Sequence, residues 1–411
     1  MKRACVRGVL LAGQVVAGSA VLLVASTANA QWTVTNLHPA GASESNAVGV
    51  SGGQQVGYAI VSNTRRGYLW TGTAASAVDL TPTGGGESGS EAYGVSDGYQ
   101  VGYARFGGEL SIRARMWSGE ANAWADLHPF SASYSIAYGA LGGQQVGLAS
   151  IAGAERASLW TGTSGSRVDL HPQGAAYSFA YATSGAQQVG QARMESGSHA
   201  ILWAGTLASW VDLHPAFGSE SQANGVSNGQ QSGWFTSIVD GSFHACLWTG
   251  TPASCVDLSP AGTTYSDVEA AFGVEQAGLA QVGNFWHASL WSGTPESWVD
   301  LHTFLPAEFL ISVAKGIWGD ATHTYVVGYG YNVNTERYEA LMWTRTNGAA
   351  CPADFDDDGT VDFFDYDAFV TCFEGGACPP GPPPKTADFD GDGSVDFFDY
   401  DAFVVAFETP C

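Results

Sequence analysis

Two stretches near the end of the chain place aspartates at spacings that suit a metal ion. Residues 354–365 read DFDDDGTVDFFD and residues 388–399 read DFDGDGSVDFFD, with aspartates at positions 1, 3, 5, 9 and 12. A hard dication takes about six to eight oxygen ligands, which a loop supplies only if the chain turns sharply. Gly359 and Gly393, at position 6, provide that turn. The spacing therefore predicts two calcium sites, with ions as the cofactors.

The predicted ligands are five aspartates in each loop, at positions 1, 3, 5, 9 and 12, and a carbonyl from position 7. They are Asp354, Asp356, Asp358, Thr360, Asp362 and Asp365 in the first loop, and Asp388, Asp390, Asp392, Ser394, Asp396 and Asp399 in the second. A merely solvated acidic tail would show no such register. Because like charges crowd each loop, we expect the tail to be largely unfolded without calcium.

The duplicated loop and following helix, with Asp at position 12, resemble the dockerin module of bacterial extracellular proteins, over about Cys351 to Cys411. The resemblance implies a cohesin-like or other extracellular protein partner, touched by loop positions 10 and 11. Those positions hold Phe363, Phe364, Phe397 and Phe398, where cellulosomal members commonly have small hydroxyl pairs. The phenylalanines could equally be core, because Phe364, Ala368 and Phe369 recur at helical spacing.

Charge separates this tail from the rest of the chain. Residues 351–411 hold 15 acidic side chains and one lysine, a net −14 of the chain's −24. Such charge indicates calcium and argues against nucleic acid as a partner, because phosphates would be repelled. The proline-rich run at 379–385 predicts a stiff, extended spacer between the half-repeats.

The N-terminus reads as a secretory signal peptide over residues 1–30. Lys2, Arg3 and Arg7 precede an apolar run from about Val9 to Ala25, and a small-residue cleavage site follows. An uncleaved membrane anchor is the alternative. We therefore expect a secreted or cell-surface protein, or a periplasmic one, with no membrane span after the signal is removed.

Six cysteines remain once Cys5 leaves with the signal, an even number in a compartment where disulfides persist. Cys246 and Cys255 bracket a tight turn, so we expect them to pair. The four tail cysteines allow three pairings, of which we favour Cys351–Cys411 with Cys372–Cys378.

Between the two ends the chain is a repeat of about 43 to 47 residues. A DL or NL string recurs seven times, beginning at Asn36, Asp79, Asp126, Asp169, Asp212, Asp257 and Asp300. Seven tryptophans keep step with it, namely Trp70, Trp117, Trp160, Trp203, Trp248, Trp291 and Trp343. Each unit offers four short apolar runs parted by glycine-rich turns, which is typical of β-propeller blades.

The phase of the repeat predicts how the ring closes. The last unit ends at Trp343 without its own DL strand, whereas residues 32–37 form a spare one. We therefore expect an all-β, seven-bladed propeller over 31–346, closed by an N-terminal strand. The AYGVS-type runs should be innermost, because small residues suit a crowded axis. A linker at 347–350 should lead to the small helical domain at 351–411.

The blade string, roughly AxGVSxGQQVGYA followed by AxLWTGT and VDL, resembles the HAF family of extracellular repeats over about 31–346. The resemblance implies a fold and an extracellular location, but no activity.

Several strings that look catalytic follow the repeat. The GxSxG pattern of hydrolases occurs at Gly49–Gly53, Gly94–Gly98 and Gly225–Gly229, always at one blade position, which predicts hairpins and not nucleophile elbows. Five histidines follow DL or NL, at His38, His128, His171, His214 and His302, while Thr81 and Ser259 fill the other two places. This interchange indicates a hydrogen-bonding corner and not a metal ligand. No catalytic residue is predicted.

One repeated position predicts a ligand-binding ring on a single face. It lies eight residues after each DL or NL aspartate or asparagine and holds Glu44, Glu87, Tyr134, Tyr177, Glu220, Tyr265 and Glu308. These residues could stack on sugars or bind cations. The alternative is that they merely tie neighbouring blades together.

Together these patterns lead us to expect a secreted, non-enzymatic binding or scaffold protein, tethered by its tail to an extracellular assembly. A carbohydrate-active enzyme, either a polysaccharide hydrolase or a lyase, is the alternative, since two ring glutamates could supply its carboxylates. A purely structural surface-layer component is the third possibility.

Overall fold

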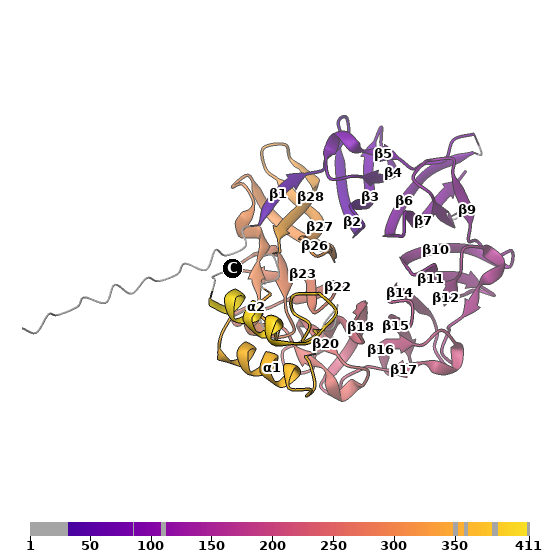
Figure 1. Ribbon diagram of the computed structural model, residues 1–411. Coiled ribbons are helices and arrows are strands. Elements are labelled where there is room, and N and C mark those ends of the chain that lie inside the picture. Colours follow the sequence, from indigo (N-terminus) through magenta and orange to yellow (C-terminus); the bar gives the residue numbers. More distant parts are fainter. Residues whose placement is uncertain are drawn as a thin grey trace, which may run out of the picture.

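The computed structural model describes residues 32–84, 86–107, 112–347, 352–356, 361–379 and 385–408. Within these residues, seven four-stranded antiparallel sheets stand around one axis as the blades of a closed ring (Figure 1). Two α-helices, α1 (Phe363–Phe373) and α2 (Phe397–Glu408), follow the ring. The predicted propeller with a small helical C-terminal unit is confirmed. The predicted signal peptide lies outside the described residues.

Each blade runs outward from the axis in chain order. The innermost strands are β2 (Glu44–Ser51), β6 (Glu87–Ser96), β10 (Ala132–Leu141), β14 (Ser178–Thr183), β18 (Gly218–Ser227), β22 (Ser266–Phe272) and β26 (Phe309–Gly319). The second strands are β3 (Gln54–Val61), β7 (Tyr99–Phe106), β11 (Gln144–Ile151), β15 (Gln188–Met194), β19 (Gln230–Ser237), β23 (Glu275–Val282) and β27 (His323–Asn332). The AYGVS-type runs are therefore innermost, as predicted.

The outer half of each blade carries the tryptophan and the DL string. The third strands are β4 (Thr64–Trp70), β8 (Ile112–Trp117), β12 (Ala154–Trp160), β16 (Gly197–Trp203), β20 (Phe243–Trp248), β24 (Phe285–Trp291) and β28 (Arg337–Thr346). The outermost are β5 (Val78–Asp79), β9 (Trp124–Asp126), β13 (Val168–Asp169), β17 (Val211–Asp212), β21 (Val256–Asp257), β25 (Val299–Asp300) and, in the last blade, β1 (Thr33–Asn36). The propeller also contains short 3-10 turns, namely η1 (Ala74–Ser76), η2 (Ser164–Ser166), η3 (Leu207–Ser209), η4 (Pro252–Ser254), η5 (Pro295–Ser297) and η6 (Leu301–Phe304).

Small residues let the inner strands crowd the axis. A Cβ added to Gly49 would lie 2.6 Å from the Tyr93 carbonyl oxygen of the next blade. At the closure of the ring, a Cβ on Gly316 would lie 2.8 Å from the Val48 carbonyl oxygen. Side chains at these positions would push neighbouring blades apart, because real Cβ atoms do not approach backbone so closely.

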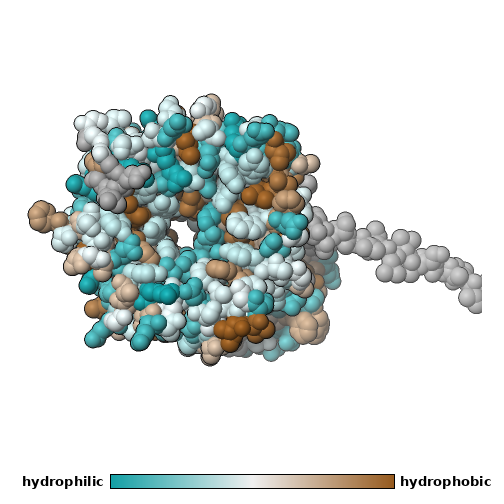
Figure 2. Space-filling view, turned by 180° about the vertical axis from the view of Figure 1, so that it is seen from behind, coloured by the Kyte–Doolittle hydropathy of each residue, from teal (hydrophilic) through white to brown (hydrophobic). Residues whose placement is uncertain are grey.

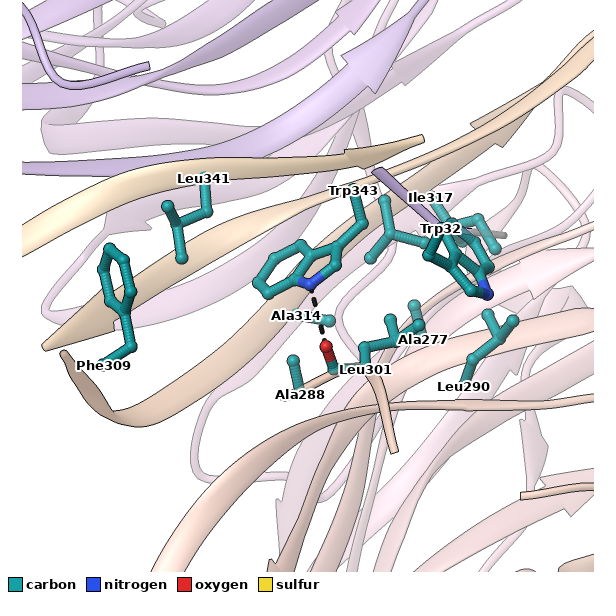
Figure 3. Close-up of a cluster of buried hydrophobic side chains, with 11 residues drawn as sticks. Trp32, Ala277, Ala288, Leu290, Leu301, Phe309, Ala314, Ile317, Leu341 and Trp343 are labelled. Atoms are coloured by element: carbon teal, nitrogen blue, oxygen red, sulfur yellow. Dashed lines mark hydrogen bonds between the residues drawn. The ribbon is translucent and has the colours of Figure 1, made fainter. Parts of the chain in front are cut away.

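The blade tryptophans form the cores between blades. All seven are fully buried, at 0% exposure. In the cluster of Figure 3, Trp343 packs with Trp32, Leu301 and Leu341, and its indole N–H donates to the Leu301 carbonyl at 3.0 Å. Burying each large ring contributes a few kcal/mol, so these cores hold adjacent sheets together.

The N-terminal strand closes the ring, as the repeat phase predicts. β1 pairs antiparallel with β28, placing Val34 opposite Trp343 and Asn36 opposite Leu341. Trp32, just before β1, is 6% exposed, and the Arg345 guanidinium lies 5.1 Å from its ring centroid. The pairing gives the last blade a fourth strand.

A buried serine on each inner strand joins every blade to its predecessor. Its hydroxyl accepts the N–H of a residue on the preceding blade's third strand, at 2.9 to 3.0 Å. The same hydroxyl meets the residue after DL or NL, at 2.7 to 2.9 Å. The seven pairs are His38–Ser45, Thr81–Ser90, His128–Ser135, His171–Ser178, His214–Ser221, Ser259–Ser266 and His302–Ser312. The predicted hydrogen-bonding corner is confirmed, and we call it the blade latch.

Trp32 should anchor the closing strand. Replacing it with Ala removes a buried ring and is expected to lower the free energy of unfolding by about 3 to 5 kcal/mol, seen as a lower melting temperature in calorimetry. Trp286→Ala is the matched control, because Trp286 is 42% exposed. Equal losses in the two variants would contradict the anchoring role.

The latch histidines should make stability depend on pH. Burial lowers the pKa of His38, His128, His171, His214 and His302. Near pH 6.5 these histidines therefore bind more protons in the unfolded chain than in the folded one. The free energy of unfolding should fall as the pH drops from about 7 to 5. Urea unfolding at the two pH values measures this loss.

A triple variant in which His128, His171 and His214 become Thr should lose less stability over the same pH range. Thr81 already makes this latch, so the change keeps the hydroxyl contact and removes the titrating ring. An unchanged pH dependence in the variant would show that other groups cause it.

Candidate functional site

All seven inner strands carry a β-bulge at one shared place, apart from a further register shift near the start of β6, β10, β18 and β26. The pairing register between inner and second strand slips by one residue at this point, as between Ala47 and Gly49 or between Ala314 and Gly316. The extra residues are Val48, Tyr93, Tyr138, Tyr181, Asn224, Glu269 and Lys315, which we call the bulge ring. Bulges re-aim side chains, and they are frequent beside binding and catalytic sites.

The bulge explains the repeated glycine of the QVGYA string. A Cβ on Gly57 would lie 1.9 Å from the Asn46 carbonyl oxygen, and one on Gly328 would lie 1.9 Å from that of Val313. The bulged strand presses its backbone against the second strand, and only glycine leaves room there.

All seven members of the bulge ring line one cavity in the axial channel. Its volume is about 460 Å³, within the range of sites for small ligands. A second cavity, of about 390 Å³, lies in the channel near the C-terminal ends of the inner strands, where Ser51 and Leu141 line it. Figure 2 shows the channel as an opening at the centre of the ring.

Tyrosines form one side of the bulge ring. The rings of Tyr93 and Tyr138, and those of Tyr138 and Tyr181, lie 5.4 Å apart and tilted. The Tyr93 hydroxyl donates to buried Glu91 at 3.0 Å, and the Tyr181 hydroxyl accepts from Gln191 at 3.0 Å. Burial raises the pKa of all three phenols, so they stay protonated at neutral pH.

Polar and charged groups form the other side. The Lys315 ammonium lies 2.5 Å from the Glu269 carboxylate across the gap between blades. Burial alone would lower the pKa of Lys315, but Glu269 outweighs it and raises the pKa. Asn224 accepts from Gln222 at 2.6 Å and donates to Asp267 at 3.3 Å. Burial, followed by the Glu269 charge, raises the pKa of Asp267. The cavity therefore has tyrosine rings on one side and hydrogen-bonding amide, carboxylate and ammonium groups on the other.

The bulge ring was missed in the sequence, although a signal exists. Its members stand between two small residues in AVG, AYG, AYG, AYA, ANG, VEA and AKG. The flanking residues stay small while the central one changes from apolar to aromatic, amide, acidic and basic. Such wide variation at one repeated position indicates that packing between the blades does not restrict the side chain there.

The ring predicted from the sequence lies near the start of the inner strands, with each residue half-buried. Five of its members, Glu44, Tyr134, Tyr177, Glu220 and Tyr265, directly precede a latch serine. Glu87 and Glu308 do not, because extra residues shift the register and put Gly89 and Ile311 there. Several members have neighbours of their own: Tyr58 donates to Glu44 at 3.4 Å, Tyr134 to Glu155, and Arg193 to Glu220 at 2.8 Å. The structure does not bring the seven into one cavity.

Two further predictions for the propeller are confirmed. Ser51, Ser96 and Ser227 of the GxSxG strings end inner strands, so these strings lie in hairpins. Cys246 and Cys255 form a disulfide with Cα atoms 5.9 Å apart.

In the tail, the structure brings together part of each predicted calcium site. Carboxylate oxygens of Asp354, Asp356 and Asp365 lie within 4.8 Å of one another, as do those of Asp388, Asp390 and Asp392. Asp358 and Thr360 lie outside the described residues. Gly393 adopts φ +91°, which provides the predicted turn.

The other loop carboxylates bind the chain itself. Asp362 caps α1 by accepting from the Phe364 N–H at 2.7 Å, and Asp396 accepts from the Phe398 N–H at 2.8 Å. Asp365 and Asp399, at position 12, are 1% exposed, and each accepts three backbone N–H groups. Ser394 donates its N–H to Asp392 at 2.8 Å.

The four predicted partner phenylalanines are on the surface. Phe363, Phe364, Phe397 and Phe398 are 68 to 72% exposed, so the alternative that they form the core is wrong. The core uses other rings instead, including Phe355, Phe369 and Phe403.

Cys372 and Cys378 pair as predicted, with Cα atoms 4.5 Å apart, while Cys351 and Cys411 lie outside the described residues. Neither α-helix combines the length and apolarity needed to cross a bilayer.

No protein-family model matches the sequence, and no curated protein matches it either. Solved structures match the fold. The β-propeller domain of the Trilobed protease from Pyrococcus furiosus, reported with an open velcro topology, is 8% identical with a TM-score of 0.51, over 74% of this chain and 97% of that one.

Two further matches are a puromycin hydrolase mutant complexed with PGG and a prolyl endopeptidase. They are 13% and 12% identical, each with a TM-score of 0.47 and each over 72% of this chain. This chain covers 53% and 48% of their lengths, about half of each.

These comparisons correct the functional expectation. The matched propeller domain with a TM-score of 0.51 belongs to a protease. The expectation of a non-enzymatic scaffold protein, with a carbohydrate-active enzyme as its alternative, is therefore wrong. It relied on the tail resemblance and on the predicted ring of glutamates and tyrosines, neither of which lies in the cavity. At such low identity the likeness itself shows only the fold.

Proposed function

We propose that the propeller serves a peptidase-related function by holding a peptide segment in the cavity of the bulge ring. The observation that carries the proposal is the chemical diversity of that ring within an otherwise repetitive axis. Phenol and amide groups suit the donors and acceptors of a peptide backbone, and the tyrosine rings suit its side chains. The likeness to a protease propeller domain supports the same class of ligand.

The size of the site also supports a peptide. A cavity of about 460 Å³ takes a few residues of an extended chain, and the second cavity continues the channel along the axis. A peptide would enter by its end or as a single strand, because the inner strands form an unbroken ring. Folded proteins would be excluded.

Peptide binding should depend on the tyrosine side of the ring. Fluorescence anisotropy with unstructured nonapeptides, labelled at the carboxyl end, is expected to give saturable binding by the full chain. Tyr138→Leu should weaken it by up to about tenfold, the value of a lost aromatic contact. Tyr99→Leu is the matched control, since Tyr99 is 47% exposed on the β6–β7 hairpin outside the cavity. Failure to bind any nonapeptide would contradict the proposal.

We also propose that the tail is a dockerin-like module that binds two calcium ions. The clustered carboxylates of the two loops support this, and so does Asp388, whose buried Oδ1 has no hydrogen-bond partner within the described part of the chain. The position 12 aspartates keep lone pairs after accepting three N–H groups, so they fit as further ligands. The exposed phenylalanines of α1 and α2 support a protein partner, and the disulfides and the predicted signal peptide support export.

Calcium titration should give a stoichiometry of two. Asp390→Asn removes a ligand at position 3 of the second loop and is expected to leave one tight site, measured by calorimetry. Asp367→Asn, on the exposed face of α1, is the matched control and should keep both sites. Helical dichroism at 222 nm that stays the same in EDTA and in millimolar calcium would contradict calcium-dependent folding of the tail.

A further inference from the structure

The cavity of the bulge ring offers its ligand acceptors more than donors. On the tyrosine side, carboxylates stand behind the phenols. Glu91, 4% exposed, accepts from the hydroxyls of Tyr93 and Tyr103. Glu155 accepts from Tyr134, and its charge helps raise the pKa of Tyr138 after burial. Since the Tyr93 proton is held by Glu91, the oxygen of that phenol faces the ligand as an acceptor.

The polar side has the same bias. Lys315 is the one cation lining the cavity within the described residues, and Glu269 already pairs with it. Asp267, 8% exposed, does not line the cavity and accepts an Asn224 N–H at 3.3 Å. Arg65 pairs with Glu91 at 3.0 Å and lies over the ring of Tyr58, which lines the cavity, but Arg65 itself is not part of the lining. The Lys315 ammonium is therefore already matched by Glu269, and no second cation lines this side within the described residues.

A positively charged group with several N–H donors suits such a site. A primary ammonium brings three donors and one charge, and tyrosine faces and phenol oxygens attract cations. An anionic ligand group would face the Glu269 carboxylate, with a lysine that is already neutralised.

We propose that the cavity selects peptides by a primary ammonium group, bound between the Glu269 side and the tyrosine side of the bulge ring. This inference rests on the proposed peptide binding and adds the feature that the site recognises. The ammonium could be the peptide's amino terminus or a lysine side chain. Both share one chemistry, so the test must tell them apart.

Three nonapeptides labelled at the carboxyl end provide that test with the full chain. One has a free amino end and no lysine, one is acetylated without lysine, and one is acetylated with a central lysine. The acetylated peptide without lysine is expected to bind at least tenfold more weakly than the free one. Tight binding of the third peptide would identify the lysine side chain as a sufficient source, and weak binding would identify the amino terminus.

Two variants connect this preference to the site. Glu269→Gln should reduce the difference between the free and acetylated peptides, and the double variant Glu269→Gln/Lys315→Met keeps the test valid if the single change leaves an unpaired, destabilising lysine. Glu296→Gln, on the exposed turn η5, should keep the full difference. Equal binding of all three peptides to the unchanged protein overturns the ammonium preference while peptide binding stands. Binding of none overturns both.

Discussion

The structure depends on the blade latch, a buried serine that satisfies a backbone N–H of the neighbouring blade. Each latch lies where two wedges meet, and removing the hydroxyl would leave a buried donor without a partner, at a cost of about 1 to 3 kcal/mol. Its repetition around the ring holds every blade at the same spacing from the next. The tryptophan cores supply bulk stability, whereas the latch supplies alignment. With the spacing fixed, the inner strands can crowd the axis and carry a bulge at one height.

The bulge ring is where this regular scaffold becomes asymmetric. The position after the bulged residue is glycine or alanine, and in the glycine cases, such as Gly49 and Gly316, an added Cβ would meet the backbone of the next blade. The bulged residue projects into the channel and escapes that restriction, so Tyr138 and Lys315 can hold equivalent positions. Function can therefore vary around the axis without disturbing the fold.

Much of the architecture could be predicted from the sequence, because it follows from periodicity. The blade number and the corner histidines follow from strings that recur at a nearly constant interval. The closing strand follows from the phase of that repeat. The disulfide of Cys246 with Cys255 was predictable because a tight turn brings the two together. The cavity was missed, since a bulge is a slip in pairing between two strands and leaves no mark in residue spacing; its signal is the variable residue between two small ones. The same counting failed at Glu87 and Glu308, where extra residues displace the register. The functional expectation drew on the tail and on the ring of residues at Glu44 and its repeats, and none of these lines the cavity.

The closing strand also bears on how the chain can fold as it is made. β1 emerges first but pairs only with β28, whose residues emerge after six complete blades. Until then its edge has no native neighbour, and the growing assembly is an open arc that can take up further strands. Circularisation is thus the final step of propeller maturation, and a ribosome that stops short of Thr346 would release an arc and not a ring.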